Sequence, residues 1–200
     1  SIYALRVLKI GLNHNPNNIV LLYDVAMSYE QQGRFDKAIG IYERIVELNA
    51  YEIEAWKHLG RLYYSTCEYL QALEAYDYVL TIDEDNDFAL FFKSNSLFNL
   101  DRWQEAVEGY LIYVERTDDK IDVWNLIAES YEKLENFSQA LYYYKLLYLV
   151  DPEDYAVLTG ISVCLQGACG LWLRSQRPWL ALGGTGCCCC GGRDFPDARW

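Results

Sequence analysis

The residue types that most often carry out catalysis or bind metals do not form a recognisable site pattern in this chain. The two histidines, His14 and His58, have no cysteine or carboxylate at a spacing typical of a metal site or an activated nucleophile. The acidic stretch 83–87, DEDND, has the composition of a calcium loop but lacks its glycine and its distal glutamate. Neither of the glycine-containing stretches 11–16 and 183–192 has the strand-then-helix context of a phosphate-binding loop. We therefore expect no catalytic site, no metal, no cofactor and no enzyme activity.

The seven cysteines are distributed unevenly, and four of them are adjacent, Cys187–Cys190. Four consecutive side chains diverge, so they cannot easily surround one tetrahedral zinc ion. Palmitoylation of this cluster is one interpretation. The interpretation that we favour is that residues from about 167 onward are not an evolved part of the region before them. Only Cys67 lies within residues 1–154, so no disulfide framework supports that region, and we expect a cytoplasmic protein.

The charge is also unevenly distributed. Residues 1–154 contain 27 acidic and 13 basic residues, whereas residues 155–200 contain 2 acidic and 4 basic residues. An acidic main region argues against nucleic acid as a partner and is compatible with basic protein partners. No run of 18 apolar residues occurs, so we expect no membrane span.

A single interval of 34 residues organises most of the chain. Alanine recurs at this interval at Ala4, Ala38, Ala72, Ala106 and Ala140. Tyrosine recurs at the same interval at Tyr42, Tyr76, Tyr110 and Tyr144. In rows of 34 that start at Ile19, Ile53, Asp87 and Ile121, the alanine stands at position 20 and the tyrosine at position 24.

The sizes of the residues in each row predict how two helices pack. Positions 4, 8 and 11 share one face of a first helix, and positions 20, 24 and 27 share one face of a second helix. Small residues at positions 8 and 20 allow the two helices to approach closely, and large residues at positions 4, 11, 17 and 24 fill the surrounding space. Because one pair cannot bury both of its faces, successive pairs must stack.

This pattern resembles the tetratricopeptide repeat, and residues 54–83 match it most closely. The matching residues in that segment are Trp56, Leu59, Gly60, Tyr63, Tyr69, Ala72 and Tyr76. The third row departs most, with Lys93 and Leu97 at positions 7 and 11. The resemblance covers residues 1 to about 165 and implies an all-α, right-handed α-solenoid of antiparallel helix pairs.

The resemblance also implies a division of the chain. We expect first helices near 19–32, 53–66, 87–100 and 121–134, and second helices near 36–48, 70–82, 104–116 and 138–150. Residues 1–18 would hold the second helix of a preceding repeat, with complete repeats at 19–52, 53–86, 87–120 and 121–154. Residues 155–166 would form the first helix of a partial repeat. We expect residues 167–200, a divergent tail rich in Gly, Cys and Trp, to be irregular because Gly167, Gly170 and Pro178 disfavour a helix. The pattern is in phase from the first residues, so we expect an excerpt of a longer protein.

In proteins of this family, positions 2, 5, 9 and 12 of the first helices line a concave groove that binds peptides. The resemblance therefore implies a groove lined by Tyr23, Met27, Lys57, Arg61, Tyr64, Phe88, Phe91, Asn95, Phe98, Asn125 and Glu129. Lys57 and Arg61 lie one turn apart and could bind a carboxylate, while the asparagines could bond to an extended backbone. The alternative for the phenylalanines is that they pack between neighbouring helices. The Lys and Asn set with which some family members clamp a C-terminal carboxylate is not present in any register.

We expect a scaffold or adaptor that binds a peptide or a partner subunit in this groove. Two alternatives remain open. The repeats could be the non-catalytic region of a larger enzyme and recruit its substrates. The array could also associate with itself through its C-terminal edge, because Leu158, Ile161 and Leu165 would have no second helix to cover them.

Overall fold

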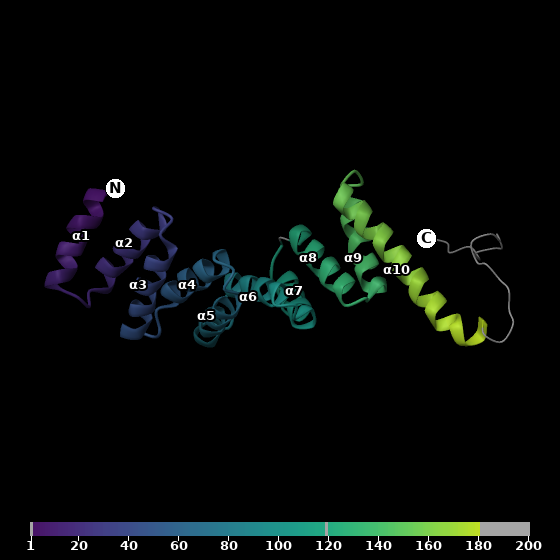
Figure 1. The fold of residues 1–200 in the computed structure, drawn as a ribbon, viewed down its shortest axis with the longest axis horizontal. Coiled ribbons are helices and arrows are strands. Elements are labelled where there is room, and N and C mark those ends of the chain that lie inside the picture. The colour runs from purple at the N-terminus through teal and green to yellow at the C-terminus, as the bar shows by residue number, and fades with distance from the viewer. Residues whose placement is uncertain (1, 119, 181–200) are drawn as a thin grey trace.

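The computed structural model describes residues 2–118 and 120–180, and these residues form α helices and no β strand. The helices follow one another as an elongated, curved array, with the N-terminus at one end and α10 at the other (Figure 1). Their bounds are α1 Ile2–His14, α2 Ile19–Glu30, α3 Phe35–Leu48, α4 Ile53–Ser65, α5 Tyr69–Ile82, α6 Asp87–Asn99, α7 Trp103–Arg116, α8 Ile121–Lys133, α9 Phe137–Val150 and α10 Tyr155–Leu180.

Helix pairing follows the 34-residue interval of the sequence. α2 packs against α3, α4 against α5, α6 against α7 and α8 against α9, and each pair packs against the next. We call α2, α4, α6, α8 and α10 the first helices, and α3, α5, α7 and α9 the second helices. First helices also contact one another between pairs, as α4 does with α6 and α8 with α10. The predicted all-α repeat solenoid is thereby confirmed.

Four of the first helices end in the same turn, which places one residue in the left-handed conformation. These residues lie one repeat apart and are Gly33 (φ 67°), Cys67 (φ 64°), Asp101 (φ 60°) and Glu135 (φ 57°). The next residue donates its backbone N–H to a carbonyl five residues earlier, as Arg34 does to Tyr29 at 3.0 Å. This is the Schellman arrangement, in which glycine is the usual left-handed residue. Three of the four turns therefore form without the residue that favours them.

Small and large residues nest in every repeat. The alanines at position 20 have no exposed surface; they are Ala38, Ala72, Ala106 and Ala140. The tyrosines at position 24 are buried beside them. One close approach is at Gly60, where a β-carbon would lie 2.6 Å from Cζ of the Tyr76 ring. The absence of a side chain at Gly60 thus lets an aromatic ring lie directly on the backbone of α4.

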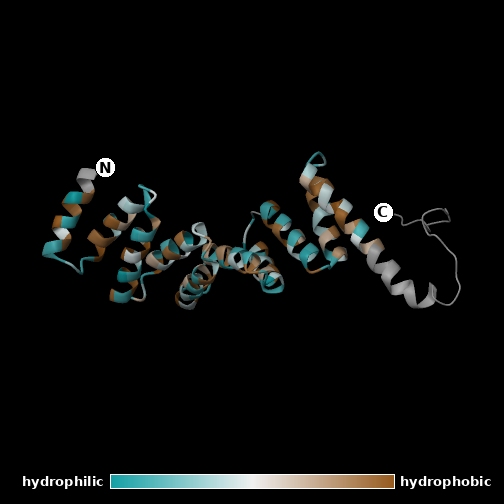
Figure 2. Ribbon diagram, viewed as in Figure 1, coloured by the Kyte–Doolittle hydropathy of each residue, from teal (hydrophilic) through white to brown (hydrophobic). Residues whose placement is uncertain are grey.

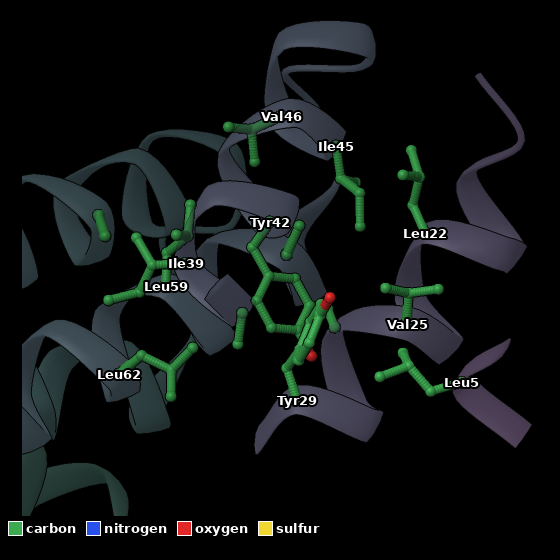
Figure 3. Close-up of a cluster of buried hydrophobic side chains, with 14 residues drawn as sticks. Leu5, Leu22, Val25, Tyr29, Ile39, Tyr42, Ile45, Val46, Leu59 and Leu62 are labelled. Carbon is green, nitrogen blue, oxygen red and sulfur yellow. The ribbon is translucent and has the colours of Figure 1, made fainter. Parts of the chain in front are cut away.

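The cores of successive pairs join one another along the array. In the cluster of Figure 3, side chains from four helices surround Tyr42: Leu5 from α1, Val25 from α2, Ile45 from α3 and Leu59 from α4. Hydrophobic and hydrophilic residues both occur along each helix from α2 to α9, as the colours of Figure 2 show. Each pair therefore provides part of the core of its neighbours, as a stacked array requires.

The C-terminal helix corrects one expectation. α10 continues through Gly167 and Pro178 to Leu180, so residues 167–180 are helical and the predicted irregular tail is wrong for that range. A β-carbon at Gly167 would overlap the ring of Phe137, so the glycine serves close packing against α9. A single glycine costs a helix only about 1 kcal/mol, which packing of this kind offsets. The Cys187–Cys190 cluster lies outside the described residues.

Candidate functional site

All eleven predicted groove residues lie on first helices, and we call the solvent-accessible side chains of α2, α4, α6 and α8 the first-helix surface. None of the eleven is buried: Met27, Arg61 and Phe88 are exposed, and the other eight are half-buried. All of them are therefore placed where a partner could reach part of the side chain.

An aromatic cluster occupies the middle of this surface. The rings of Phe88 and Phe92 lie 4.6 Å apart, those of Phe91 and Phe92 lie 5.3 Å apart, and Phe92 stacks on Tyr76 at 5.8 Å. Phe91 and Phe98 pack against the core of the array, whereas Phe88 is 39% exposed. Both interpretations of the phenylalanines thus hold in part, because two of them contribute to the core and one is open to solvent.

The two predicted cations on α4 already have carboxylate partners within the chain. Nζ of Lys57 lies 3.0 Å from Oε1 of Glu54 and 5.2 Å from the centre of the Phe88 ring. The guanidinium of Arg61 pairs with the carboxylate of Glu30 on the preceding first helix. A partner carboxylate would have to displace one of these groups.

The predicted asparagines are also engaged within the chain. Oδ1 of Asn95 accepts a hydrogen bond of 2.6 Å from the Tyr110 hydroxyl, and Nδ2 of Asn125 donates one of 2.8 Å to Oε1 of Glu129. Each asparagine keeps further donor or acceptor capacity, since an amide side chain can form up to four such bonds.

Glu30 is the centre of a cluster that the sequence did not reveal, and we call Glu30, Tyr42, His58 and Arg61 the Glu30 cluster. The Tyr42 hydroxyl donates a 2.6 Å bond to Oε1 of Glu30, and Nδ1 of His58 lies 3.1 Å from the same oxygen. The imidazole of His58 stacks on the Tyr42 ring at 4.8 Å. Burial, reinforced by the bond to Glu30, raises the pKa of Tyr42 above its ordinary value.

Comparisons with protein families place these features in context. The family model described as tetratricopeptide repeat matches residues 121–154, which hold α8 and α9. The family model described as anaphase-promoting complex, cyclosome, subunit 3 matches residues 31–112.

The chain is a tetratricopeptide repeat protein.

Solved structures share the fold of this tetratricopeptide repeat protein. The structure of MamA is 22% identical with a TM-score of 0.67, and the alignment covers 72% of this chain and 79% of MamA. YrrB, described as a tetratricopeptide repeat protein with an unusual peptide-binding site, is 15% identical with a TM-score of 0.68. The alignment covers 80% of this chain and 83% of YrrB. A tetratricopeptide repeat protein from Parabacteroides merdae is 18% identical with a TM-score of 0.70. That alignment covers 84% of this chain and 66% of the other protein. A comparison with curated protein sequences gave no match.

The first-helix surface of this tetratricopeptide repeat protein holds groups that can form apolar contacts and hydrogen bonds. Within residues 2–118 and 120–180, no group of three or more His, Cys, Asp or Glu side chains could hold a metal ion. Among the helices that the structure describes, none combines the length and apolar character needed to cross a bilayer. The surface offers exposed aromatic rings, amides and carboxylates.

Proposed function

We propose that this tetratricopeptide repeat protein is a scaffold or adaptor that binds a peptide, or an extended segment of a partner subunit, along its first-helix surface. The observation that supports the proposal most is the partial exposure of Met27 on α2 and Phe88 on α6, at 46% and 39%, on two first helices that are separated by α4. Partly exposed apolar side chains on a regular framework provide large contact area at a small cost in conformational entropy.

The charges of this surface favour a basic or neutral partner over an acidic one. Lys57 and Arg61 are neutralised by Glu54 and Glu30, and the main region of the chain carries many more acidic than basic residues. Complementary charge accelerates association and excludes partners of like charge. We expect an extended peptide with apolar anchors and at least one basic residue.

The proposal is tested by selecting peptides from a random dodecapeptide library displayed on phage, with the full chain as the target. Binding of a selected peptide is then measured by fluorescence polarisation with the variant Met27→Ser/Phe88→Ser. The affinity should fall about tenfold or more, because central apolar contacts carry most of the binding energy of such interfaces.

The matched control is Leu70→Ser/Ile112→Ser, which removes two exposed apolar residues from the second helices α5 and α7. This variant should bind like the unaltered chain, and circular dichroism should show the same helicity for both variants. An equal loss of peptide affinity in both variants, or selection of no peptide at all, would contradict the proposal.

Self-association is a second candidate, supported by a specific observation. Leu149 and Tyr155, at the junction of α9 and α10, are 78% and 82% exposed, and Leu158 and Leu165 on α10 are exposed as well. Multi-angle light scattering of the full chain, with and without Leu158→Ser/Leu165→Ser, tests this. A concentration-dependent dimer that the variant abolishes would favour self-association, and a monomer in both cases would exclude it.

A further inference from the structure

The first and last junctions between first helices are built from the same glutamate and tyrosine. Glu132 and Tyr144 stand three repeat intervals after Glu30 and Tyr42, and the Tyr144 hydroxyl donates a 3.1 Å bond to Oε2 of Glu132. This bond repeats the one between Tyr42 and Glu30. The two junctions therefore share one half of the Glu30 cluster.

The other half of the cluster is replaced. Gly160 and Val163 of α10 stand three intervals after His58 and Arg61 of α4. At the first junction the imidazole covers the tyrosine ring and the guanidinium pairs with the glutamate. At the last junction neither a ring nor a cation stands at these positions.

A cavity of about 440 Å³ lies in that place, between α8 and α10. Glu129 and Glu132 of α8, Tyr144 of α9, and Gly160 and Val163 of α10 are among the residues that line it. Tyr144 is 4% exposed, whereas Tyr42, Tyr76 and Tyr110 have no exposed surface. We call this cavity the α8–α10 pocket.

The two carboxylates of the α8–α10 pocket are oriented but not neutralised. Asn125 donates to Oε1 of Glu129, and Tyr144 donates to Oε2 of Glu132. Lys133 also lines the pocket, yet no cation within the part of the chain whose side chains are described lies within ion-pair distance of either carboxylate. Glu30, by contrast, is paired with Arg61.

We propose that the α8–α10 pocket binds an arginine side chain of the partner polypeptide, which takes the place that Arg61 holds at the first junction. The planar guanidinium can donate two parallel bonds to Glu132 and one to Glu129, as charge-assisted pairs of this kind do. Its aliphatic stem would pack against Val163. A lysine fits less well because its ammonium cannot bridge the carboxylates in one plane. The proposal rests on the proposed peptide-binding function and names a residue of the peptide.

The test uses the peptide selection described above, with the full chain as target. The selected peptides should carry arginine at one fixed position, and replacing that arginine by alanine should weaken binding about 10- to 100-fold. Replacement by lysine should weaken binding less.

The variant Val163→Arg supplies the guanidinium from the chain itself, as Arg61 does at the first junction. It should weaken binding of the arginine peptide about tenfold or more while the alanine peptide is unaffected. The matched control is Ser162→Arg, which adds the same charge to the same helix at a residue that does not line the pocket. Glu129→Gln/Glu132→Gln should act like Val163→Arg, and its control of equal charge is Glu115→Gln/Glu153→Gln.

The outcomes separate this inference from the function on which it rests. Peptides without a fixed basic residue, or an arginine preference that survives Val163→Arg, would overturn the pocket assignment and leave peptide binding intact. Selection of no peptide would overturn the proposed function itself. An arginine preference lost equally in Val163→Arg and Ser162→Arg would reduce the effect to net charge and would also overturn the assignment.

Discussion

At the scale of single residues, the position-24 tyrosines combine a buried ring with a hydroxyl group that can form a hydrogen bond. Tyr42, Tyr110 and Tyr144 each donate a hydrogen bond to a side chain of the first helix in the same repeat, namely Glu30, Asn95 and Glu132. The Tyr76 hydroxyl is buried and has no hydrogen-bond partner within the described residues. The hydroxyl groups of these four equivalent tyrosines therefore contribute unequally to the stability of the fold.

Replacing these hydroxyls one at a time should separate the contributions. Tyr42→Phe removes a bond to a carboxylate and should lower the free energy of unfolding by about 1.5 kcal/mol. Tyr76→Phe removes a buried hydroxyl without a partner and should raise the free energy of unfolding by about 1 kcal/mol. Urea unfolding followed by circular dichroism measures both, and equal destabilisation would show that Tyr76 does have a polar partner.

The same tyrosines predict that the fold is sensitive to alkali. Burial is the main cause that raises the pKa of Tyr42, Tyr76, Tyr110 and Tyr144 above the ordinary value of 10.0. A raised pKa in the folded state means that the unfolded chain releases its protons first. Stability is therefore fully present below pH 10 and decreases as the pH rises toward the folded-state pKa values, by about 1.4 kcal/mol per pH unit for each tyrosine.

This prediction is checked by titrating tyrosinate absorbance and helical circular dichroism together from pH 8 upward. The exposed tyrosines, such as Tyr51, should ionise near their ordinary pKa with the helices intact. A second rise in absorbance at higher pH should coincide with loss of helicity. A single titration near pH 10 that leaves the helicity unchanged would contradict the burial of the four rings.

At the scale of elements, the 34-residue interval and the pattern of small and large residues predicted closely where the helices begin and end. The first helices begin at Ile19, Ile53, Asp87 and Ile121, as expected, and the second helices begin one residue earlier than expected, at the aromatic residue of position 17. The predicted ends of these helices differ from the observed ends by two residues or fewer. Regular packing of small against large residues explains why local pattern was sufficient here.

Other features depended on contacts that a local pattern does not contain. Arg61 pairs with Glu30, which precedes it by 31 residues on another helix, so its spacing from Lys57 did not indicate that it was already neutralised. Gly167, which we expected to disfavour a helix, lies within α10 and packs closely against the Phe137 ring of α9, a contact that the residues around Gly167 do not reveal. The left-handed residues Cys67, Asp101 and Glu135 gave no sign in their own chemistry, although their spacing from Gly33 would have identified them.

Two glycines on neighbouring helices test the packing of the elements. Gly60→Ala should destabilise the chain by about 2 kcal/mol, because its β-carbon would overlap the Tyr76 ring. Gly40→Ala is the control, since its β-carbon would have no side chain or other helix within 4 Å and α3 continues on both sides. That variant should gain up to about 1 kcal/mol from the helix propensity of alanine. Thermal unfolding followed by circular dichroism compares the stability of the two variants. An equal loss of stability in both would contradict the close packing at Gly60.

At the scale of the whole molecule, stacking turns local packing into one continuous surface. Because each helix pair contacts the next, residues far apart in the sequence line up across the first helices, and the array is elongated and curved (Figure 1). An extended surface of this kind suits an extended partner better than a small molecule. The aromatic cluster in the middle and the α8–α10 pocket at the C-terminal end would contact different residues of one peptide.

The central claim is that a partner polypeptide binds to the first helices and not to the second helices. The most direct measurement places p-benzoyl-phenylalanine at Phe88 of α6 or at Leu70 of α5, one at a time in the full chain, and irradiates each with a selected peptide. Both residues are exposed, so both photoreactive groups can reach solvent. The account predicts a covalent adduct from Phe88 and none from Leu70. Adducts from Leu70 alone, or equally from both, would contradict it.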